Sequence, residues 1–271
     1  MPASDLSATD SAAAKRLIVN ADDLGRTRGI NEGIFEAHRR GIVTSATLMV
    51  NYESAREAAA MLESTPELGV GLHVALTGGV PTLPADQVAS LVDARGRLPA
   101  KPEGLLGAAA REIAAEARAQ LERFRELTGG DPTHFDSHHH AHRIPAVCDA
   151  LIGLARECDR PVRCASSEVE QRLREAGIGT PEAFVEDFFG EAASLPGLLE
   201  ILSELESGTT ELMCHPGRVD DDLRRGSSYV GERERELAVL TDPRLAAQIE
   251  RLGIRLVNFE SCAHPGACRV C

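Results

Sequence analysis

Residues 16–23 read RLIVNADD, an apolar run that ends in two adjacent carboxylates. A nearly continuous apolar run of this length is typical of a parallel strand that is buried on both faces. In folds built from such strands, functional groups gather where the strands end. Asp22 and Asp23 therefore mark a first candidate site. One carboxylate could hold a metal ion while the other handles a proton, or the pair could simply cap a turn and contact solvent.

Further runs of the same kind recur along the chain. They cover 45–50, 69–76, 133–138, 161–166, 210–215 and 254–259. Between them lie segments with apolar residues at helical spacing, including 29–41, 54–64, 103–129 and 145–158. Strands that alternate with helices favour parallel pairing through right-handed crossovers. The sequence therefore predicts an α/β fold, a distorted TIM-barrel-like (β/α) barrel of about seven parallel strands, with a doubly wound open sheet as the alternative.

The bulk composition restricts the function classes. A chain of 271 residues suits one large domain, and its net charge of −13 argues against nucleic acid as a partner. The start of the chain lacks the basic and apolar pattern of a secretory signal, no segment is apolar enough for a transmembrane span, and the cysteines are scattered. We therefore expect a cytoplasmic protein with a disordered tail (1–15), one barrel domain (16–260) and a cysteine-rich tail (261–271).

Histidines cluster at the predicted ends of two middle strands. His73 lies within the third strand, where a buried core role is the simpler interpretation. Five of the nine histidines fall within 134–142, at the end of the fourth strand. Continued alternation along that strand would place Asp136, His138 and His140 on one face. Imidazole binds zinc and related ions, and a carboxylate can orient a ligating histidine from behind, so this segment favours a metal site over a histidine-rich polar loop.

The strand at 210–215 ends in Cys214 and His215, followed by proline. Alternation places these two side chains on opposite faces. We expect His215 in the site as an acid and Cys214 in the core, although a cysteine nucleophile with a histidine base is the alternative. A carboxylate and two histidines from separate strand ends would leave open positions on a catalytic metal. The proline- and glycine-rich loop from Gly78 to Pro102 follows a strand end and could form a wall of this site.

Several motifs together resemble one family. They are VNADDLGRTRGINEGI (19–34), GIVTSATLMVN (41–51), GLHVALTGG (71–79), THFDSHHHAH (133–142), LMCHPG (212–217) and SSYVGERERELAVL (227–240). In this order they resemble the YdjC-like (ChbG-type) carbohydrate deacetylases. That family includes chitooligosaccharide deacetylases and a branch associated with hopanoid biosynthesis. The resemblance runs from about residue 16 to about residue 260.

The resemblance implies a role for each site residue. By position it implies Asp23, His73 and His138 as ligands of one divalent metal ion, with Asp22 as general base and His215 as general acid. We further expect Tyr229 and Arg233 to bind substrate, and Asp136 and His140 to support the ligands from behind. The ligand types suit zinc, manganese, cobalt or nickel. The resemblance permits magnesium or zinc.

The implied activity is removal of an acetyl group from an N-acetylated sugar, either of the chitooligosaccharide type or lipid-linked. A metal-activated water would attack the amide, with the Asp base and the His acid moving protons. Alternatives are another barrel hydrolase that acts on a phosphoester or cyclic amide, and a sugar-binding barrel without activity. The expected partner is a small N-acetylated sugar, and a homodimer is compatible with the sequence. Cys262, His264, Cys268 and Cys271 could hold a structural zinc ion or form a tail with free thiols.

Overall fold

The central strand of the sheet is formed by the apolar run that ends in Asp22 and Asp23. The computed structural model describes residues 14–262, and in it β1 spans Lys15–Leu24 and is almost entirely buried. One edge of β1 pairs with β6 (Gly208–Cys214). Its other edge pairs with β7 (Ile254–Leu256) over the first half and with β2 (Ser45–Leu48) over the second. A strand with partners on both edges and cover on both faces needs the apolar composition seen in 16–21.

The remaining strands extend the sheet in both directions. Beyond β2 lie β3 (Gly69–Val74) and β4 (Phe135–Ser137), and beyond β6 lies β5 (Ala183–Val185). Each strand runs parallel to its neighbours, in the order β4-β3-β2-β1-β6-β5 with β7 on β1. The curled parallel sheet within the α/β fold confirms the prediction of a distorted barrel.

One of the seven predicted strands is replaced by another. Segment 161–166 makes only a single parallel bridge, between Val162 and Phe135, instead of a strand. The next residue, Arg163, directs its side chain to buried carboxylates. The segment therefore contributes to a buried polar cluster and adds little to the hydrogen bonding of the sheet. The strand that sequence patterning missed is β5, which has only three residues and is partly exposed.

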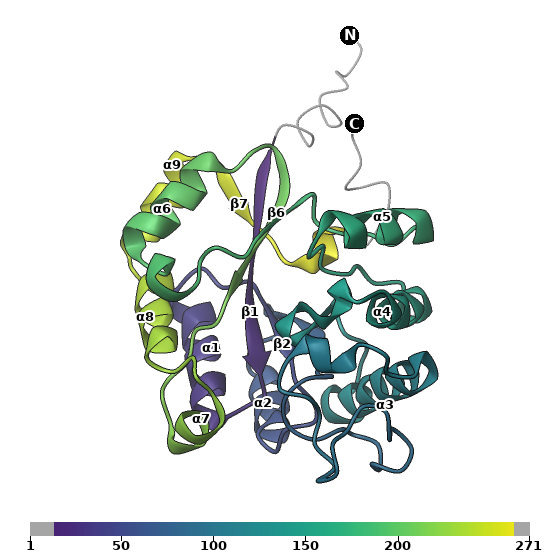
Figure 1. The fold of residues 1–271 in the computed structure, drawn as a ribbon. Coiled ribbons are helices and arrows are strands. Elements are labelled where there is room, and N and C mark those ends of the chain that lie inside the picture. The colour runs from purple at the N-terminus through teal and green to yellow at the C-terminus, as the bar shows by residue number, and fades with distance from the viewer. Residues whose placement is uncertain (1–13, 263–271) are drawn as a thin grey trace.

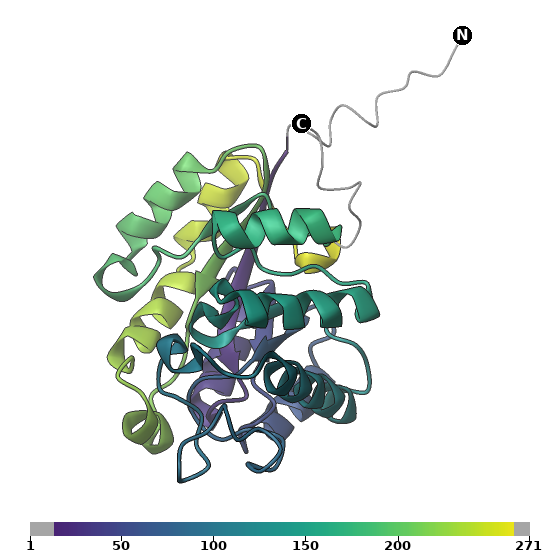
Figure 2. The ribbon, with the colours of Figure 1, turned by 45° about the vertical axis from the view of Figure 1, so that its right-hand side comes forward.

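Helices cover the outside of the curled sheet (Figure 1). They are α1 (Arg28–Arg40), α2 (Ala55–Leu62), α3 (Ala110–Thr128), α4 (Pro145–Cys158), α5 (Ser167–Ala176), α6 (Leu195–Glu204), α7 (Asp221–Gly226), α8 (Gly231–Leu240) and α9 (Arg244–Arg251). Figure 2 shows α3, α4 and α5 stacked beside one another, while α1, α8, α6 and α9 follow the opposite flank in Figure 1.

The helix expected over 103–129 is shorter than predicted. A 3-10 turn at Pro102–Leu105 precedes it, and α3 begins only at Ala110. Between them Leu106 and Ala109 are extended, and Gly107 has a φ of 87°, a left-handed conformation that breaks the helix and that glycine adopts at little cost.

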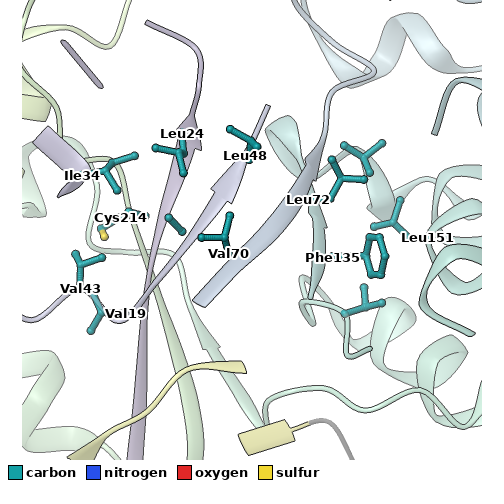
Figure 3. Packing of buried hydrophobic residues seen from close by; sticks show 14 of the residues in the cluster. Val19, Leu24, Ile34, Val43, Leu48, Val70, Leu72, Phe135, Leu151 and Cys214 are labelled. Carbon is teal, nitrogen blue, oxygen red and sulfur yellow. The ribbon is translucent and has the colours of Figure 1, made fainter. Parts of the chain in front are cut away.

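Apolar side chains fill the space between sheet and helices (Figure 3). On one side, Val19 and Cys214 pack with Ile34 and Val43. The Cys214 thiol is buried and donates to the Asn20 carbonyl at 3.3 Å. Its position in the core agrees with the expectation from alternation along β6.

The terminal predictions fall largely beyond the described part of the chain. The greater part of the predicted tail 1–15 lies outside residues 14–262, as do His264, Cys268 and Cys271, while Cys262 is buried against Ile18 and Phe259. Within 14–262, every helix is too short or too polar to cross a bilayer.

Candidate metal and active site

A bulge at the end of β1 brings both adjacent carboxylates to one cavity. The register between β1 and β2 shifts between Ala21 and Leu24, and Asp23 has a φ of 71°. Such a bulge inserts a residue and re-aims the side chains around it. As a result Asp22 and Asp23 are both buried and both line the cavity, although strict alternation would send them to opposite faces.

Two histidine nitrogens from other parts of the chain converge on one oxygen of Asp23. Its Oδ1 lies 3.7 Å from Nε2 of His73 and 3.8 Å from Nε2 of His138. Atoms that share one ion at about 2.0–2.2 Å lie roughly 3–4 Å from one another. Among residues 14–262, Asp23 Oδ1 is buried without a hydrogen-bond partner. A buried carboxylate oxygen left in this state is costly unless something that this chain does not supply binds it.

Both histidine rings are oriented by hydrogen bonds on their far nitrogens. His73 Nδ1 lies 2.6 Å from Asp136 Oδ1, its neighbour on β4, and His138 Nδ1 lies 2.9 Å from the Thr77 carbonyl. Both acceptors require a proton on Nδ1, so in each neutral ring Nε2 carries the lone pair that faces Asp23. Burial lowers the pKa of His138 to about 3, which keeps that ring neutral.

The carboxylates around His73 favour positive charge at this position. Burial by itself would lower the pKa of His73, but Asp136, Asp22 and Asp23 outweigh it and raise the pKa. Burial also disfavours the charged form of Asp23, and the guanidinium groups of Arg233 and Arg26 overcome it, so the pKa of Asp23 lies well below its usual range. The carboxylates of Asp22, Asp23 and Asp136 thus favour a cation beside His73.

Arg163 is the cation that holds the buried carboxylates of the site together, and local sequence patterns did not predict this role. Its guanidinium holds Asp22 through two hydrogen bonds of 2.7 Å, donates to Glu211 at 2.8 Å and lies 3.0 Å from Asp136. Asp22, His73 and Asp136 also offer atoms within 4.8 Å of one another, a second combination that could hold an ion. The sequence holds one indication of this cluster, because each of two predicted buried strands, 161–166 and 210–215, contains a charged residue.

The buried cluster gives its carboxylates different charge states. Burial opposes ionisation of Asp22, but Arg163 outweighs it and holds the pKa of Asp22 far below its usual range. Glu211 shares the same arginine, yet burial dominates there and raises its pKa to about 7. Asp22 is therefore an anion at neutral pH, whereas Glu211 titrates close to it.

His215 follows β6 and is positioned by a second buried carboxylate. The backbone N–H of His215 donates to Glu236, and the Tyr229 hydroxyl donates to the same group at 2.5 Å. Burial lowers the pKa of His215 to about 4, and its Nδ1 is buried without a partner in the described chain. The Arg233 guanidinium donates to the carboxylate of Asp23, so Arg233 contacts a carboxylate of the site.

After β4 the backbone no longer follows the strand alternation that was predicted for the histidine-rich segment. The strand ends at Ser137, and His139 and His140 have φ values of 54° and 51°. His138 thereby faces Asp23, while His140 turns aside and places Nε2 3.3 Å from Glu186. Asp136, the other residue expected to support the ligands, does contact His73 directly.

The convergent groups form the floor of a cavity of about 910 Å³. The loop from Gly78 to Pro102 supplies one wall, as its position after β3 suggested, and the segment from Gly226 to Tyr229 supplies another. In Figure 1 the arrow of β1 points to this end of the molecule, where the loop after β3 and α7 lie. Arg26, Tyr52 and Phe189 also line the cavity. The volume lies within the range of small-molecule pockets.

Known proteins resemble this chain over nearly its whole length. Its sequence is 43% identical over 243 residues to a carbohydrate deacetylase from Geobacillus stearothermophilus, covering 89% of this chain and 96% of that protein. It is 39% identical to a chitooligosaccharide deacetylase from Yersinia pestis, covering 92% and 99%. A proposed cellobiose-phosphate cleavage protein from Enterococcus faecalis superposes with a TM-score of 0.86 at 34% identity, covering 92% and 98%.

A more distant structural likeness concerns the fold alone. A family 4 carbohydrate esterase from Streptomyces lividans, solved with acetate, gives a TM-score of 0.53 at 12% identity and covers 96% of this chain and 98% of that one.

The model of the YdjC-like protein family matches residues 16–251. This range contains the strand-end groups described above and ends before β7. With that match and relatives near 40% identity over nine-tenths of the chain, the protein belongs to the YdjC-like family.

Proposed function

We propose that this protein is a metal-dependent hydrolase that removes the acetyl group from an N-acetylated sugar. The relatives named as carbohydrate and chitooligosaccharide deacetylases support the reaction class. The observation that carries the proposal is the buried, unpartnered Asp23 Oδ1 facing two oriented histidine nitrogens, with a second carboxylate beside it. A binding barrel without activity would have no need for that second carboxylate to be held ionised.

We assign the metal to Asp23, His73 and His138. In the competing set, Arg163 already occupies the carboxylates of Asp22 and Asp136, and Asp136 accepts the proton on His73 Nδ1. A cation placed there would meet the guanidinium. One carboxylate and two imidazoles suit zinc, and magnesium would add waters as further ligands. When bound, the ion would polarise the amide carbonyl and lower the pKa of a water molecule.

Asp22 is proposed as the general base. Arg163 donates to both of its oxygens at 2.7 Å and keeps it ionised, so the carboxylate is fixed in orientation and in the charge state that a proton acceptor needs. Asn20 adds a third donor, at 2.9 Å. Both oxygens of Asp22 are thus engaged by Arg163, and the side chain still lines the cavity.

His215 is proposed as the general acid, because the amine leaves readily only when its nitrogen is protonated. With a pKa near 4 the ring is neutral at pH 7. It therefore gives the leaving nitrogen a proton only after one has arrived from the attacking water by way of Asp22. Overall, one water adds across the amide bond, and acetate and the free amino sugar are formed.

The proposal is tested by incubating the purified protein with divalent metals and a panel of N-acetylated sugars and following the loss of one acetyl group by mass spectrometry. Asp22→Asn is the matched control, because it keeps the side-chain shape and removes the base. We expect acetate release by the wild type alone, with metal bound to both. Turnover of a phosphoester or a cyclic amide, without acetate release from any sugar, would support the alternative hydrolase.

The ligand assignment is tested separately by metal analysis. Asp23→Ala, His73→Ala and His138→Ala should each purify without the ion, whereas Asp22→Asn should stay loaded. An empty Asp22→Asn together with a loaded Asp23→Asn would support the competing set.

A further inference from the structure

Phe189 presents an apolar ring to the cavity. Among residues 14–262, the large apolar side chains with substantial exposure are Val80, Leu106 and Phe189, the last at 47%. Of these three, only Phe189 lines the cavity. An exposed aromatic ring in a pocket that also carries convergent polar groups is a common feature of ligand sites, because apolar side chains supply contact area and a few polar groups fix orientation.

The ring of Phe189 is held in a fixed plane by Tyr229. The two rings are stacked, with centroids 4.2 Å apart and planes 11° from parallel. Tyr229 is itself fixed, because its hydroxyl donates to Glu236 and accepts from the backbone N–H of Gly190 at 2.9 Å. One face of Phe189 is therefore covered, and the exposed part of the ring belongs to its other face and edge. The stack is a rigid, preorganised surface.

The stack also stands beside the proposed acid. The centroid of Phe189 is 5.6 Å from that of His215, and the centroid of Tyr229 is 5.8 Å from it. His215 is about equally far from both rings, so it lies beside the stack, within reach of a substituent that extends past the edge of a ring lying on Phe189. The nitrogen that receives a proton from His215 must be carried by just such a group.

We propose that Phe189 is the stacking platform for the pyranose ring that carries the leaving nitrogen, and that it makes the enzyme selective for cyclic amino sugars over acyclic amides. This inference rests on the proposed function. The C–H face of a pyranose is apolar and matches an aromatic ring in size. Stacking there would direct the acetamido substituent toward His215. Glu186, three residues earlier and also on the cavity wall, has a partly exposed carboxylate that can accept from ring hydroxyls.

The first test compares two substrates across matched variants. The substrates are an N-acetylated sugar that the wild type turns over and N-(2-hydroxyethyl)trifluoroacetamide, an activated amide without a ring. We expect Phe189→Ala to lose about 10- to 30-fold in kcat/KM on the sugar and less than about twofold on the acyclic amide. Phe189→Tyr should retain activity on both, and Phe189→Leu should fall between. Leu106→Ala, which removes an exposed apolar side chain outside the cavity, is the control. Equal losses on the two substrates, or no loss on the sugar, would overturn the platform.

The second test does not depend on turnover. Calorimetric titration with N-acetylglucosamine uses the metal-loaded Asp22→Asn variant, which lacks the proposed base. Its binding should weaken about tenfold when Phe189→Ala is added and not when Leu106→Ala is added. If the wild type deacetylates no sugar, the proposed function fails, and this titration alone decides the platform. Equal affinity with and without Phe189→Ala, or no binding in either case, counts against it.

Discussion

Replacing Arg163 by methionine should destabilise the protein strongly. The side chain of Arg163 is completely buried and contacts three carboxylates that are themselves buried, those of Asp22, Asp136 and Glu211. Methionine fills similar space but leaves these groups without their cation. Removing one partner of a buried ion pair costs about 3–5 kcal/mol, because the remaining charge is left uncompensated. Three dependent carboxylates place the expected loss in the upper half of that range.

Proton uptake limits the loss and makes it depend on pH. Without the arginine, burial acts unopposed and the pKa values of Asp22 and Glu211 rise in the folded state. The folded variant then holds protons that the unfolded chain has released, so its stability falls as pH rises. The loss of unfolding free energy relative to wild type should therefore be larger at pH 8 than at pH 6.

Urea unfolding followed by circular dichroism at both pH values measures this loss. The matched control is Arg174→Met on α5, which breaks an exposed pair with Glu170 and should cost at most about 0.5 kcal/mol. A loss below about 1 kcal/mol for Arg163→Met at pH 8 would refute the reasoning. So would a loss that is the same at pH 6 and pH 8.

Three further predictions concern the acid, the titrating carboxylate and the metal. His215→Ala should keep full metal content and lose about 10²–10⁴-fold in kcat on the amide, with a smaller loss on an ester analogue whose leaving group needs less protonation; equal losses would count against the acid role. Between pH 5 and 7 the folded protein retains a proton on Glu211 that the unfolded chain has lost, so the unfolding free energy of wild type should fall by about 2 kcal/mol more than that of Glu211→Gln, as urea melts can show. Chelation should abolish activity and leave the circular dichroism spectrum unchanged, because the proposed ligands come from strands with a large apolar core of their own; unfolding on chelation would indicate a structural ion.

The sequence predicted those parts of the fold that depend on local patterning. The apolar runs at 16–21 and 69–76 became central strands because burial on both faces leaves a clear signal. Sequence patterns predicted strands incorrectly where tertiary contacts determine the local structure. Segment 161–166 looks like a strand but makes a single bridge beside Arg163, and β5 is three residues long with no periodicity to detect.

The candidate site likewise contains residues that the sequence could predict and residues that only tertiary contacts place. The strand ends that carry Asp23, His73 and His138 were identified from residue type and family resemblance, and the structure brings the three side chains together. Arg163 was missed because a charged residue within a predicted buried strand does not reveal which carboxylates, distant in sequence, it contacts. The turn of His140 toward Glu186 depends on two left-handed residues, which alternation along a strand does not anticipate.

The two adjacent aspartates show how one local distortion can separate two chemical roles. Neighbours on a regular strand face opposite sides, so a base and a ligand on consecutive residues need the register shift that β1 makes between Ala21 and Leu24. The bulge alone would leave two like charges competing for one ion. Arg163 removes that competition by binding both oxygens of Asp22, whereas Asp23 shares only its Oδ2 with arginines and leaves Oδ1 without a partner in the described chain. The placement of the guanidinium groups, more than the order of the two aspartates in the sequence, therefore favours Asp22 as the base and Asp23 as the ligand.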